Sequence, residues 1–192
     1  YEPTLAAGGL RLSSLRAATD LWSVGHRCGI EQGGHLWCWG ENPQGQLGDG
    51  GIVGSNVPVQ EISASAWIDV AVGHGWSGQY TCGVKVGGSL WCWGHAIRGS
   101  LGQGPVEDSP EPGRVAPDAG MGWLDVAGGA GHACAIREDH TAWCWGLAAR
   151  GELGNGAAVY NDFRTEPTAV LGGHRFVRIE VGAFFSCALD EE

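Results

Sequence analysis

The sequence lacks several features that would place it in other classes of protein. It has one methionine and no apolar run near the roughly 18 residues that a membrane helix needs, so we expect no membrane insertion. Cationic residues are scarce, with 11 lysines and arginines against 21 aspartates and glutamates. The resulting net charge of −10 repels the phosphates of nucleic acids. Nucleic acid is therefore not an expected partner.

Glycine and tryptophan, in contrast, are abundant. The chain has 35 glycines and 10 tryptophans among 192 residues. The glycines follow no strict three-residue period, which excludes collagen. A hydrophobic content of 43% is too high for a disordered chain. The composition predicts a folded domain.

An internal repeat organises the whole sequence. The step Trp-Cys-Trp-Gly occurs three times, about 53 residues apart, and each copy is followed by the pattern Gly-x-Leu-Gly-x-Gly, which we call the glycine frame. The repeat predicts three complete units and one partial unit after a separate N-terminal segment, which could add a further strand. The predicted boundaries are 1–19 for the N-terminal segment and about 20–66, 67–122, 123–175 and 176–192 for the units.

Apolar residues within a unit alternate with polar or small ones, as in 67–72 and 81–86. This is strand periodicity, and Gly87-Gly88 then separates two apolar runs as the turn of a β-hairpin does. Each unit holds about four short strands. Four-stranded units at this period are typical of β-propeller blades, so we predict an all-β propeller with about 3.6 blades present. A β-solenoid is the alternative, although its coils are usually shorter.

Six of the seven cysteines form three pairs separated by ten positions. Folding each pair around its glycine turn places the two cysteines opposite each other across a hairpin, within disulfide distance. Structural zinc is the rival interpretation, but zinc sites usually bring cysteines closer together in the sequence. We therefore predict one disulfide in each complete unit, and an extracellular, cell-surface or periplasmic location. The predicted bonds are Cys28–Cys38, Cys82–Cys92 and Cys134–Cys144.

The tryptophans of the Trp-Cys-Trp-Gly step also have a packing interpretation. Successive strand residues face opposite ways, so Trp37 and Trp39 share one face while Leu36 and Cys38 share the other. A strand that is apolar on both faces must be covered on both, as between two neighbouring blades. An aromatic cage for a ligand is the alternative use of these side chains.

The combination of hairpin, Cys-Trp-Gly and glycine frame resembles the repeat of the regulator of chromosome condensation family, the RCC1-like propellers. Residues 39–50, read as Trp-Gly-Glu-Asn-Pro-Gln-Gly-Gln-Leu-Gly-Asp-Gly, are similar to that family's W-G-x-N-x-x-G-Q-L-G-x-G segment. The resemblance implies a seven-bladed propeller and a role in binding proteins, such as small GTPases or, in a secreted bacterial inhibitor, β-lactamases. The paired cysteines resemble the secreted bacterial branch. The second and third units lack the asparagine of the first.

Two regions depart from the repeat and are therefore candidates for recognition. The second unit carries about four extra residues before its cysteine, including Trp76 and Tyr80, and such aromatic residues on a glycine-rich loop suit a protein-binding surface. We predict Trp76 and Tyr80 as partner-binding residues. The loop from Pro105 to Gly122 is long, acidic and rich in proline, and reads either as a second recognition element or as a solvated connector.

Catalytic and metal-binding patterns are weak. His26 and His132 occupy a position taken by Tyr80 and Phe185 in the other units, so no ring of histidines is available and structural histidines are the better interpretation. Aspartates recur in the blade pattern, which also indicates a structural role. We expect no catalytic residue, metal or cofactor. The recurring aspartates are Asp20, Asp69 and Asp125, with Arg178 in the last unit.

The sequence therefore predicts a secreted or cell-surface, non-catalytic module that binds or scaffolds other proteins. A propeller lyase or glycosidase with paired carboxylates at the central channel, and a structural subunit of a larger extracellular assembly, are the alternatives. Cys187 has no partner ten positions later. We expect the ring to be completed either by further sequence or by a second chain, as a homodimer or larger assembly in which residues 8–12 supply the missing strand.

Overall fold

The computed structural model describes residues 11–17, 25–75, 78–115, 120–157 and 162–191. Apart from one short 3-10 turn, η1 (Ile97–Gly99), its regular elements are all strands. Within these residues no helix is long and apolar enough to cross a membrane. The all-β prediction is confirmed.

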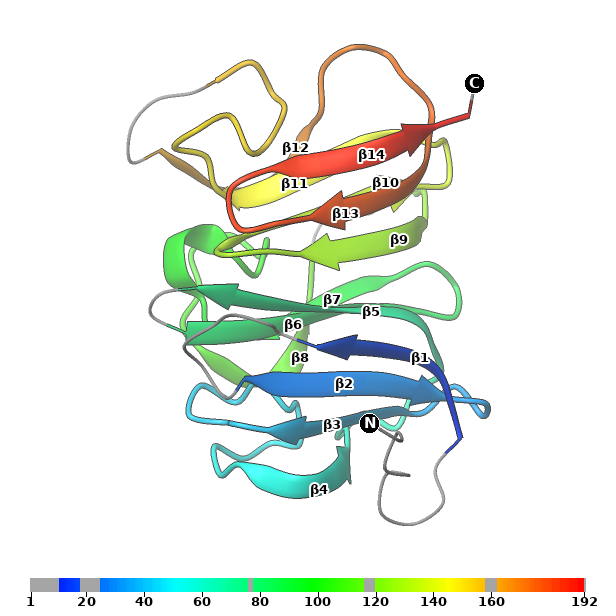
Figure 1. Ribbon diagram of the computed structural model, residues 1–192, viewed down its shortest axis with the longest axis vertical. Coiled ribbons are helices and arrows are strands. Elements are labelled where there is room, and N and C mark those ends of the chain that lie inside the picture. The colour runs from blue at the N-terminus through cyan, green and yellow to red at the C-terminus, as the bar shows by residue number, and fades with distance from the viewer. Residues whose placement is uncertain (1–10, 18–24, 76–77, 116–119, 158–161, 192) are drawn as a thin grey trace, which may run out of the picture.

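The strands form three four-stranded sheets and one two-stranded sheet, all antiparallel and in the order of the chain. Figure 1 shows them stacked one above another, from the first sheet at the bottom to β13 and β14 at the top. Each sheet is one propeller blade. Blade 1 contains β1 (Leu12–Ala17), β2 (His26–Glu31), β3 (Leu36–Gly40) and β4 (Ser55–Gln60). Blade 2 contains β5 (Trp67–Gly75), β6 (Gly78–Lys85), β7 (Leu90–Gly94) and β8 (Ser109–Arg114). Blade 3 contains β9 (Trp123–Gly128), β10 (His132–Arg137), β11 (Ala142–Leu147) and β12 (Phe163–Ala169), and blade 4 contains β13 (Phe176–Val181) and β14 (Ser186–Asp190).

The first blade begins earlier in the chain than the repeat suggested. Strand β1 pairs with β2, with Leu12 opposite Glu31 and Arg16 opposite Cys28. Residues 12–17 therefore form a further strand, as the prediction for the N-terminal segment allowed, and this strand belongs to blade 1. We expected residues 8–12 to supply the missing strand in the last blade of a second chain. For Leu12 this is wrong, because Leu12 pairs with Glu31 in blade 1 of its own chain. Residues 8–10 lie outside the described residues.

The cysteine pairs hold the second and third strands of each complete blade together. Cys28 is opposite Cys38, Cys82 opposite Cys92 and Cys134 opposite Cys144, with Cα atoms 4.0 to 4.1 Å apart. All three predicted disulfides are present. Cys187 is the free and exposed cysteine of the described chain.

The core lies between blades, as the two-sided apolar strands predicted. Leu36 and Cys38 of blade 1 pack in one buried cluster with Trp67 and Trp93 of blade 2. The next cluster joins Leu90 and Cys92 of blade 2 to Trp123 and Trp145 of blade 3 in the same way. Trp67, Trp93, Trp123 and Trp145 are therefore interblade core and not a ligand cage, whereas Trp37 and Trp39 of blade 1 are only partly buried.

A cation lies between two tryptophans in each of blades 2 and 3. The ammonium group of Lys85 lies 4.7 Å from the ring centre of Trp67 and 4.1 Å from that of Trp91. Arg137 stacks on the equivalent pair in blade 3, at 4.8 Å from Trp123 and 4.1 Å from Trp143. In each blade the cation thus lies against one buried tryptophan, Trp67 or Trp123, and one partly buried tryptophan, Trp91 or Trp143.

Candidate functional site

The glycine frame of one blade receives a tryptophan from the next. At the junction of blades 1 and 2, the indole Nε1 of Trp93 donates a hydrogen bond of 3.0 Å to the carbonyl oxygen of Gln46. A Cβ atom on Gly48, whose φ is +73°, would lie only 2.6 Å from that nitrogen. The frame therefore needs glycine at this position both for its backbone conformation and for the close approach of the indole.

The junction of blades 2 and 3 repeats this arrangement. Trp145 Nε1 donates a 2.9 Å hydrogen bond to the carbonyl oxygen of Ser100, and a Cβ atom on Gly102 would lie 2.8 Å from the indole nitrogen. Both indoles are completely buried. The sequence Gly-x-Leu-Gly thus forms a slot for a tryptophan of the following blade.

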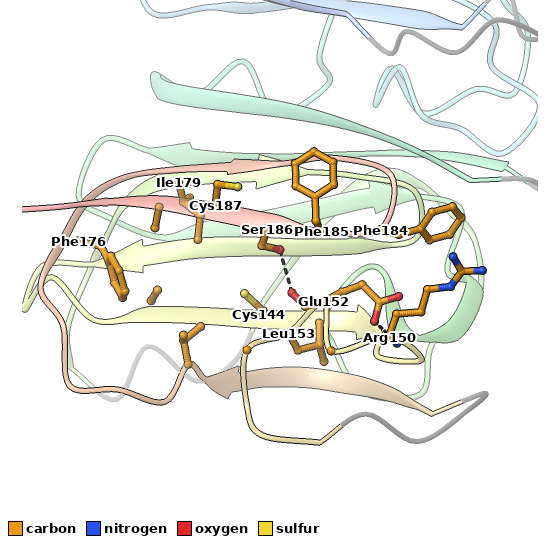
Figure 2. A pocket seen from close by; sticks show the side chains of 15 residues that line it. Cys144, Arg150, Glu152, Leu153, Phe176, Ile179, Phe184, Phe185, Ser186 and Cys187 are labelled. Atoms are coloured by element: carbon orange, nitrogen blue, oxygen red, sulfur yellow. Dashed lines mark hydrogen bonds between the residues drawn. The ribbon is translucent and has the colours of Figure 1, made fainter.

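The junction of blades 3 and 4 has the same slot without an indole. A pocket of about 310 Å³ lies between the third glycine frame and the hairpin β13–β14. Figure 2 shows Leu153, Phe176 and Ile179 among its walls, together with Cys187 on β14 and the polar residues Glu152 and Ser186. Among the described residues, no strand pairs with the outer edge of β14.

Polar groups at this pocket are incompletely paired. The carbonyl oxygen of Glu152 accepts one hydrogen bond, 2.9 Å long, from Ser186 Oγ, whereas the equivalent oxygen of Gln46 accepts two, from Trp93 and from Thr81. The carboxylate of Glu152 is buried, and its Oε2 accepts a 2.6 Å hydrogen bond from the Arg150 backbone. Its Oε1 has no hydrogen-bond partner. The pocket therefore has acceptors available to a donor.

A second cluster lies where the first strands of the blades meet. Asp69 Oδ2 accepts a 3.0 Å hydrogen bond from the backbone of Val126, and Asp125 Oδ2 accepts one of 2.8 Å from Ile179, so each aspartate binds the next blade. Arg16 forms a 3.6 Å ion pair with Asp69. Burial, opposed by the Val126 bond and reinforced by Asp125, raises the pKa of Asp69 to about 7. These aspartates are structural, as predicted, and Asp20 lies outside the described residues.

Asp69 and Asp125 are neighbouring carboxyl groups on the first strands β5 and β9, and the enzyme alternative requires such a pair at the central channel. Both carboxylates, however, are already engaged by backbone N–H groups. Among the described residues, no cluster of three or more histidine, cysteine or acidic side chains could hold a metal ion.

The two repeated histidines are buried and paired between blades. His26 Nε2 lies 2.7 Å from Thr81 Oγ1, and its Nδ1 lies 2.7 Å from Gln79 Oε1. His132 Nε2 lies 3.0 Å from Ser186 Oγ. Burial lowers the pKa of each to about 4, so both are neutral at physiological pH. They are structural histidines, as predicted.

Tyr80 is not a surface residue, and its prediction as a partner-binding residue is wrong. Its side chain is 1% exposed, and its hydroxyl donates to the carbonyl oxygen of His132 and accepts a 3.1 Å hydrogen bond from the backbone of Gly129. The tyrosine therefore connects blade 2 to blade 3. Trp76 lies outside the described residues. The extra residues near it lengthen β5 and β6, which pair as far as Gly75 and Gly78.

The loop from Pro105 to Gly122 is only partly a connector. Its central residues form β8, the outermost strand of blade 2, and Asp108 binds His95 at 2.9 Å and the backbone of Ala96 at 2.9 Å. Residues 116–119 lie outside the described residues. The acidic residue nearest the strand thus has a local structural role.

One feature was missed at the sequence level. The residue after the first aromatic of each of blades 2 to 4 is apolar and exposed: Ile68 is 51% exposed, Leu124 45% and Val177 51%. We call these three residues the apolar row. Because β5, β9 and β13 are the first strands of successive blades, the row repeats around one rim. Its signal was the apolar second residue of the segments 67–70, 123–126 and 176–179, which read Trp-Ile-Asp-Val, Trp-Leu-Asp-Val and Phe-Val-Arg-Ile.

Comparisons with known proteins agree with this architecture. The family description "Regulator of chromosome condensation (RCC1) repeat" matches residues 33–78, 87–136 and 139–189. The chain is 31% identical over 170 residues to the E3 ubiquitin-protein ligase HERC2 of Mus musculus, covering 85% of this chain and 3% of that protein. It is 27% identical to the ultraviolet-B receptor UVR8 of Arabidopsis thaliana, covering 77% of this chain and 32% of the receptor.

Solved structures show the same fold. Yeast RCC1 (Prp20), solved with Kap60 bound, superposes with a TM-score of 0.73 at 17% identity and covers 95% of this chain and 43% of that chain. Prp20p of Saccharomyces cerevisiae, in a study of its binding to Gsp1p and histones, gives 0.67 at 20% identity, covering 85% of this chain and 41% of that chain. The chain thus spans less than half of these relatives. From its matched repeats and its blades, it belongs to the RCC1 repeat family of β-propellers.

Proposed function

We propose that this chain is a non-catalytic, protein-binding or scaffolding propeller module that works in an oxidising compartment, as a secreted, cell-surface or periplasmic protein. Relatives whose names or titles record protein binding, such as yeast RCC1 with Kap60, support the protein-binding part. The three disulfides support the compartment, because such bonds persist where thiols are not kept reduced.

The apolar row carries the proposal. Ile68, Leu124 and Val177 hold equivalent positions in three consecutive blades, and each is about half exposed. Single exposed apolar residues need no explanation, but an exposed apolar side chain repeated around one rim is suited to a protein partner. The acidic net charge of −10 favours a partner that presents lysine or arginine around an apolar centre.

The test replaces the three residues of the apolar row by serine together. The variant and the wild-type chain are each incubated with extract from the native source and cross-linked, and captured proteins are identified by mass spectrometry. We expect the wild type to capture a protein whose cross-links map to the strands β5, β9 and β13, and the variant to lose it. A matched control replaces Ile52 and Val53, which are also exposed but lie on the loop before β4. Equal capture by all three proteins would remove the row from the proposal.

The propeller-enzyme alternative is retained because of Asp69 and Asp125. If they served as an acid and base in a lyase or glycosidase, polysaccharide panels would be cleaved by the wild type, and Asp125→Asn would abolish cleavage. We expect no turnover by either protein. The third alternative, a structural subunit, predicts that native material elutes from a sizing column only as a large assembly.

A further inference from the structure

Lys85, at the end of β6, is the only lysine in the sequence. Its Nζ lies 4.7 Å from the ring centre of Trp67 and 4.1 Å from that of Trp91, and it donates a hydrogen bond of 2.9 Å to Ser63 Oγ. The residue is only partly buried, so a small molecule in the solvent can reach the amine. The chain therefore presents a single ε-amino group, and three contacts fix its position.

Ser63 connects this amine to a buried carboxylate. Its Oγ donates a hydrogen bond of 2.9 Å to Oε2 of Glu61, and its backbone N–H donates one of 2.6 Å to Oε1. Trp67 Nε1 donates a further bond of 3.1 Å to Oε2, so the carboxylate is held in place. Glu61 itself is buried. A continuous path for a proton thus runs from Lys85 Nζ through Ser63 Oγ to Glu61 Oε2, and we call these three residues the amine cluster.

The amine cluster departs from the repeat. Glu61 and Val115 hold equivalent positions, because each donates its backbone N–H to the first residue of the third strand, in blades 1 and 2 respectively. Lys85 and Arg137 are also equivalent, since each lies opposite the first tryptophan of its blade. The next junction thus has valine and arginine at these two positions. Arginine stacks on a tryptophan pair equally well, but it keeps its proton and is not a nucleophile at neutral pH. Packing on the tryptophans alone therefore does not require lysine.

The surroundings of Lys85 favour its reaction with a carbonyl group. Burial lowers the pKa of Lys85, although the negative charge of Glu61 opposes this, and a lower pKa increases the neutral, nucleophilic fraction of the amine. A protonated imine, the product with an aldehyde, still carries a positive charge. It therefore keeps both contacts with the indole rings and the attraction to Glu61. Acylation would remove the charge and lose these interactions.

We propose that Lys85 is a covalent binding site for small aldehydes, held as a protonated imine, with Ser63 and Glu61 as a proton relay. The ammonium group gives one proton to Ser63 Oγ while Ser63 passes its own to Glu61 Oε2. The neutral amine then attacks the carbonyl carbon, and a second proton moves from nitrogen to the carbonyl oxygen. The relay returns the first proton to this new hydroxyl group, which leaves as water as the C=N bond forms. The reaction consumes no oxidant or reductant, and it is independent of protein binding by the apolar row.

The probe is salicylaldehyde, whose imines absorb at longer wavelength than the free aldehyde. Imine formation on the folded chain is followed by absorbance, the imine is reduced with cyanoborohydride, and peptide mapping distinguishes Lys85 from the α-amino group. We expect the imine of Lys85 to have a dissociation constant at least about tenfold lower than that of N-acetyl-lysine amide, a factor equivalent to about 1.4 kcal/mol. Equal constants for the protein and the free lysine derivative would overturn the proposal.

Arg137→Lys supplies a matched control within the same molecule. It places a second lysine on a tryptophan pair, at a junction where Val115 stands in the position of Glu61. Asp139, a carboxylate near Arg137, is partly exposed and accepts hydrogen bonds from Thr141. We expect the trapped adduct to be at least about tenfold more abundant on Lys85 than on the introduced lysine. Equal labelling of the two would contradict the role of the amine cluster.

Variants of the amine cluster separate a relay from a structural role. Ser63 is exposed, so Ser63→Ala should fold, and it should slow both formation and hydrolysis of the imine by about tenfold with an unchanged dissociation constant. Ser65→Ala is the control, because its hydroxyl lies 3.1 Å from Ser63 Oγ, one step farther from the amine. Glu61→Gln should slow the reaction similarly, and Lys85→Arg should give no adduct at this position. If Glu61→Gln does not fold, Ser63→Ala decides the matter: unchanged rates in that variant would overturn the relay.

Discussion

The two filled junctions and the open one share the glycine frame but differ in the groups that meet it. In the first, Thr81 Oγ1 and Trp93 Nε1 both donate hydrogen bonds to the carbonyl oxygen of Gln46. At the third junction, Ser186 Oγ donates to the carbonyl oxygen of Glu152, as Thr81 does to that of Gln46. No tryptophan of the described residues enters this junction, and a pocket of about 310 Å³ remains. The glycine frame therefore holds its shape without the indole, which indicates that the frame is formed within its own blade and the tryptophan is added to it.

The substitution with the largest expected effect on stability is Trp93→Ala. Removing a fully buried indole and its hydrogen bond should lower the free energy of unfolding by about 3–5 kcal/mol. Trp39 holds the same place on β3, but the described residues provide no blade against it. Trp39→Ala should therefore cost only about 1 kcal/mol or less. Urea denaturation of both variants measures the difference, and equal losses would show that the slot contributes nothing special.

The second test opens a complete hairpin so that it resembles β13–β14. Replacing Cys82 and Cys92 by serine should lower the free energy of unfolding by roughly 3 kcal/mol, the usual effect of a short disulfide loop. Cys187→Ser is the control, since this thiol is exposed and unbonded, and it should change stability by less than about 0.5 kcal/mol. In intact-mass analysis after alkylation without reduction, we expect six protected cysteines. Labelling of any of the six would contradict both the pairing and the oxidising compartment.

The third test concerns the tyrosine that links blades 2 and 3. Tyr80→Phe removes a hydroxyl that serves the backbone of Gly129 and His132, and it should cost about 1–3 kcal/mol because these groups stay buried. Phe185 holds the same position in blade 4 and is exposed, so Phe185→Leu should be close to neutral. Thermal unfolding monitored by circular dichroism compares the two. A neutral Tyr80→Phe would mean that water replaces the hydroxyl.

The smallest test compares pH profiles. Because the pKa of Asp69 is raised to about 7, the folded state binds a proton that the unfolded state has released, and this group makes stability fall as pH rises from about 4 to 7. His26 and His132, with pKa values lowered to about 4, act in the opposite direction between about 4 and 6.5. In Asp69→Asn the first contribution is lost, so its stability relative to wild type should grow as pH rises toward 7. A difference independent of pH would contradict this assignment.

Much of the fold was predictable because the repeat fixes positions relative to one another. Ten-residue spacing placed Cys28 opposite Cys38, and alternation placed Trp37 and Leu36 on different faces. The burial of Tyr80 had a signal too, since it stands two residues before a cysteine, where His26 and His132 stand. Its position beside extra loop residues led to the wrong interpretation.

The candidate sites were harder to predict, because they depend on contacts between blades. Nothing in the local sequence around Glu152 shows that its carbonyl oxygen is one donor short, since that donor comes from a residue of the following blade. The start of blade 1 at Leu12 was missed for a related reason. Residues 12–17 lack the Trp-x-Asp-Val pattern, and only their pairing with β2 identifies them.

In blades 2 and 3, the aspartate of the first strand accepts a hydrogen bond from the backbone of the following blade. Asp69 accepts from Val126 of the next blade, and Asp125 accepts from Ile179 of the one after it, so both of these junctions take their acceptor from the earlier blade and their donor from the later one. A duplicated blade inserted between two others would bring both halves of this contact with it. Tandem duplication could thus lengthen such an array without compensating mutations, provided that the aspartate is kept. Blade 4 has Arg178 at this position, so a copy of it would bring no acceptor for the blade that followed.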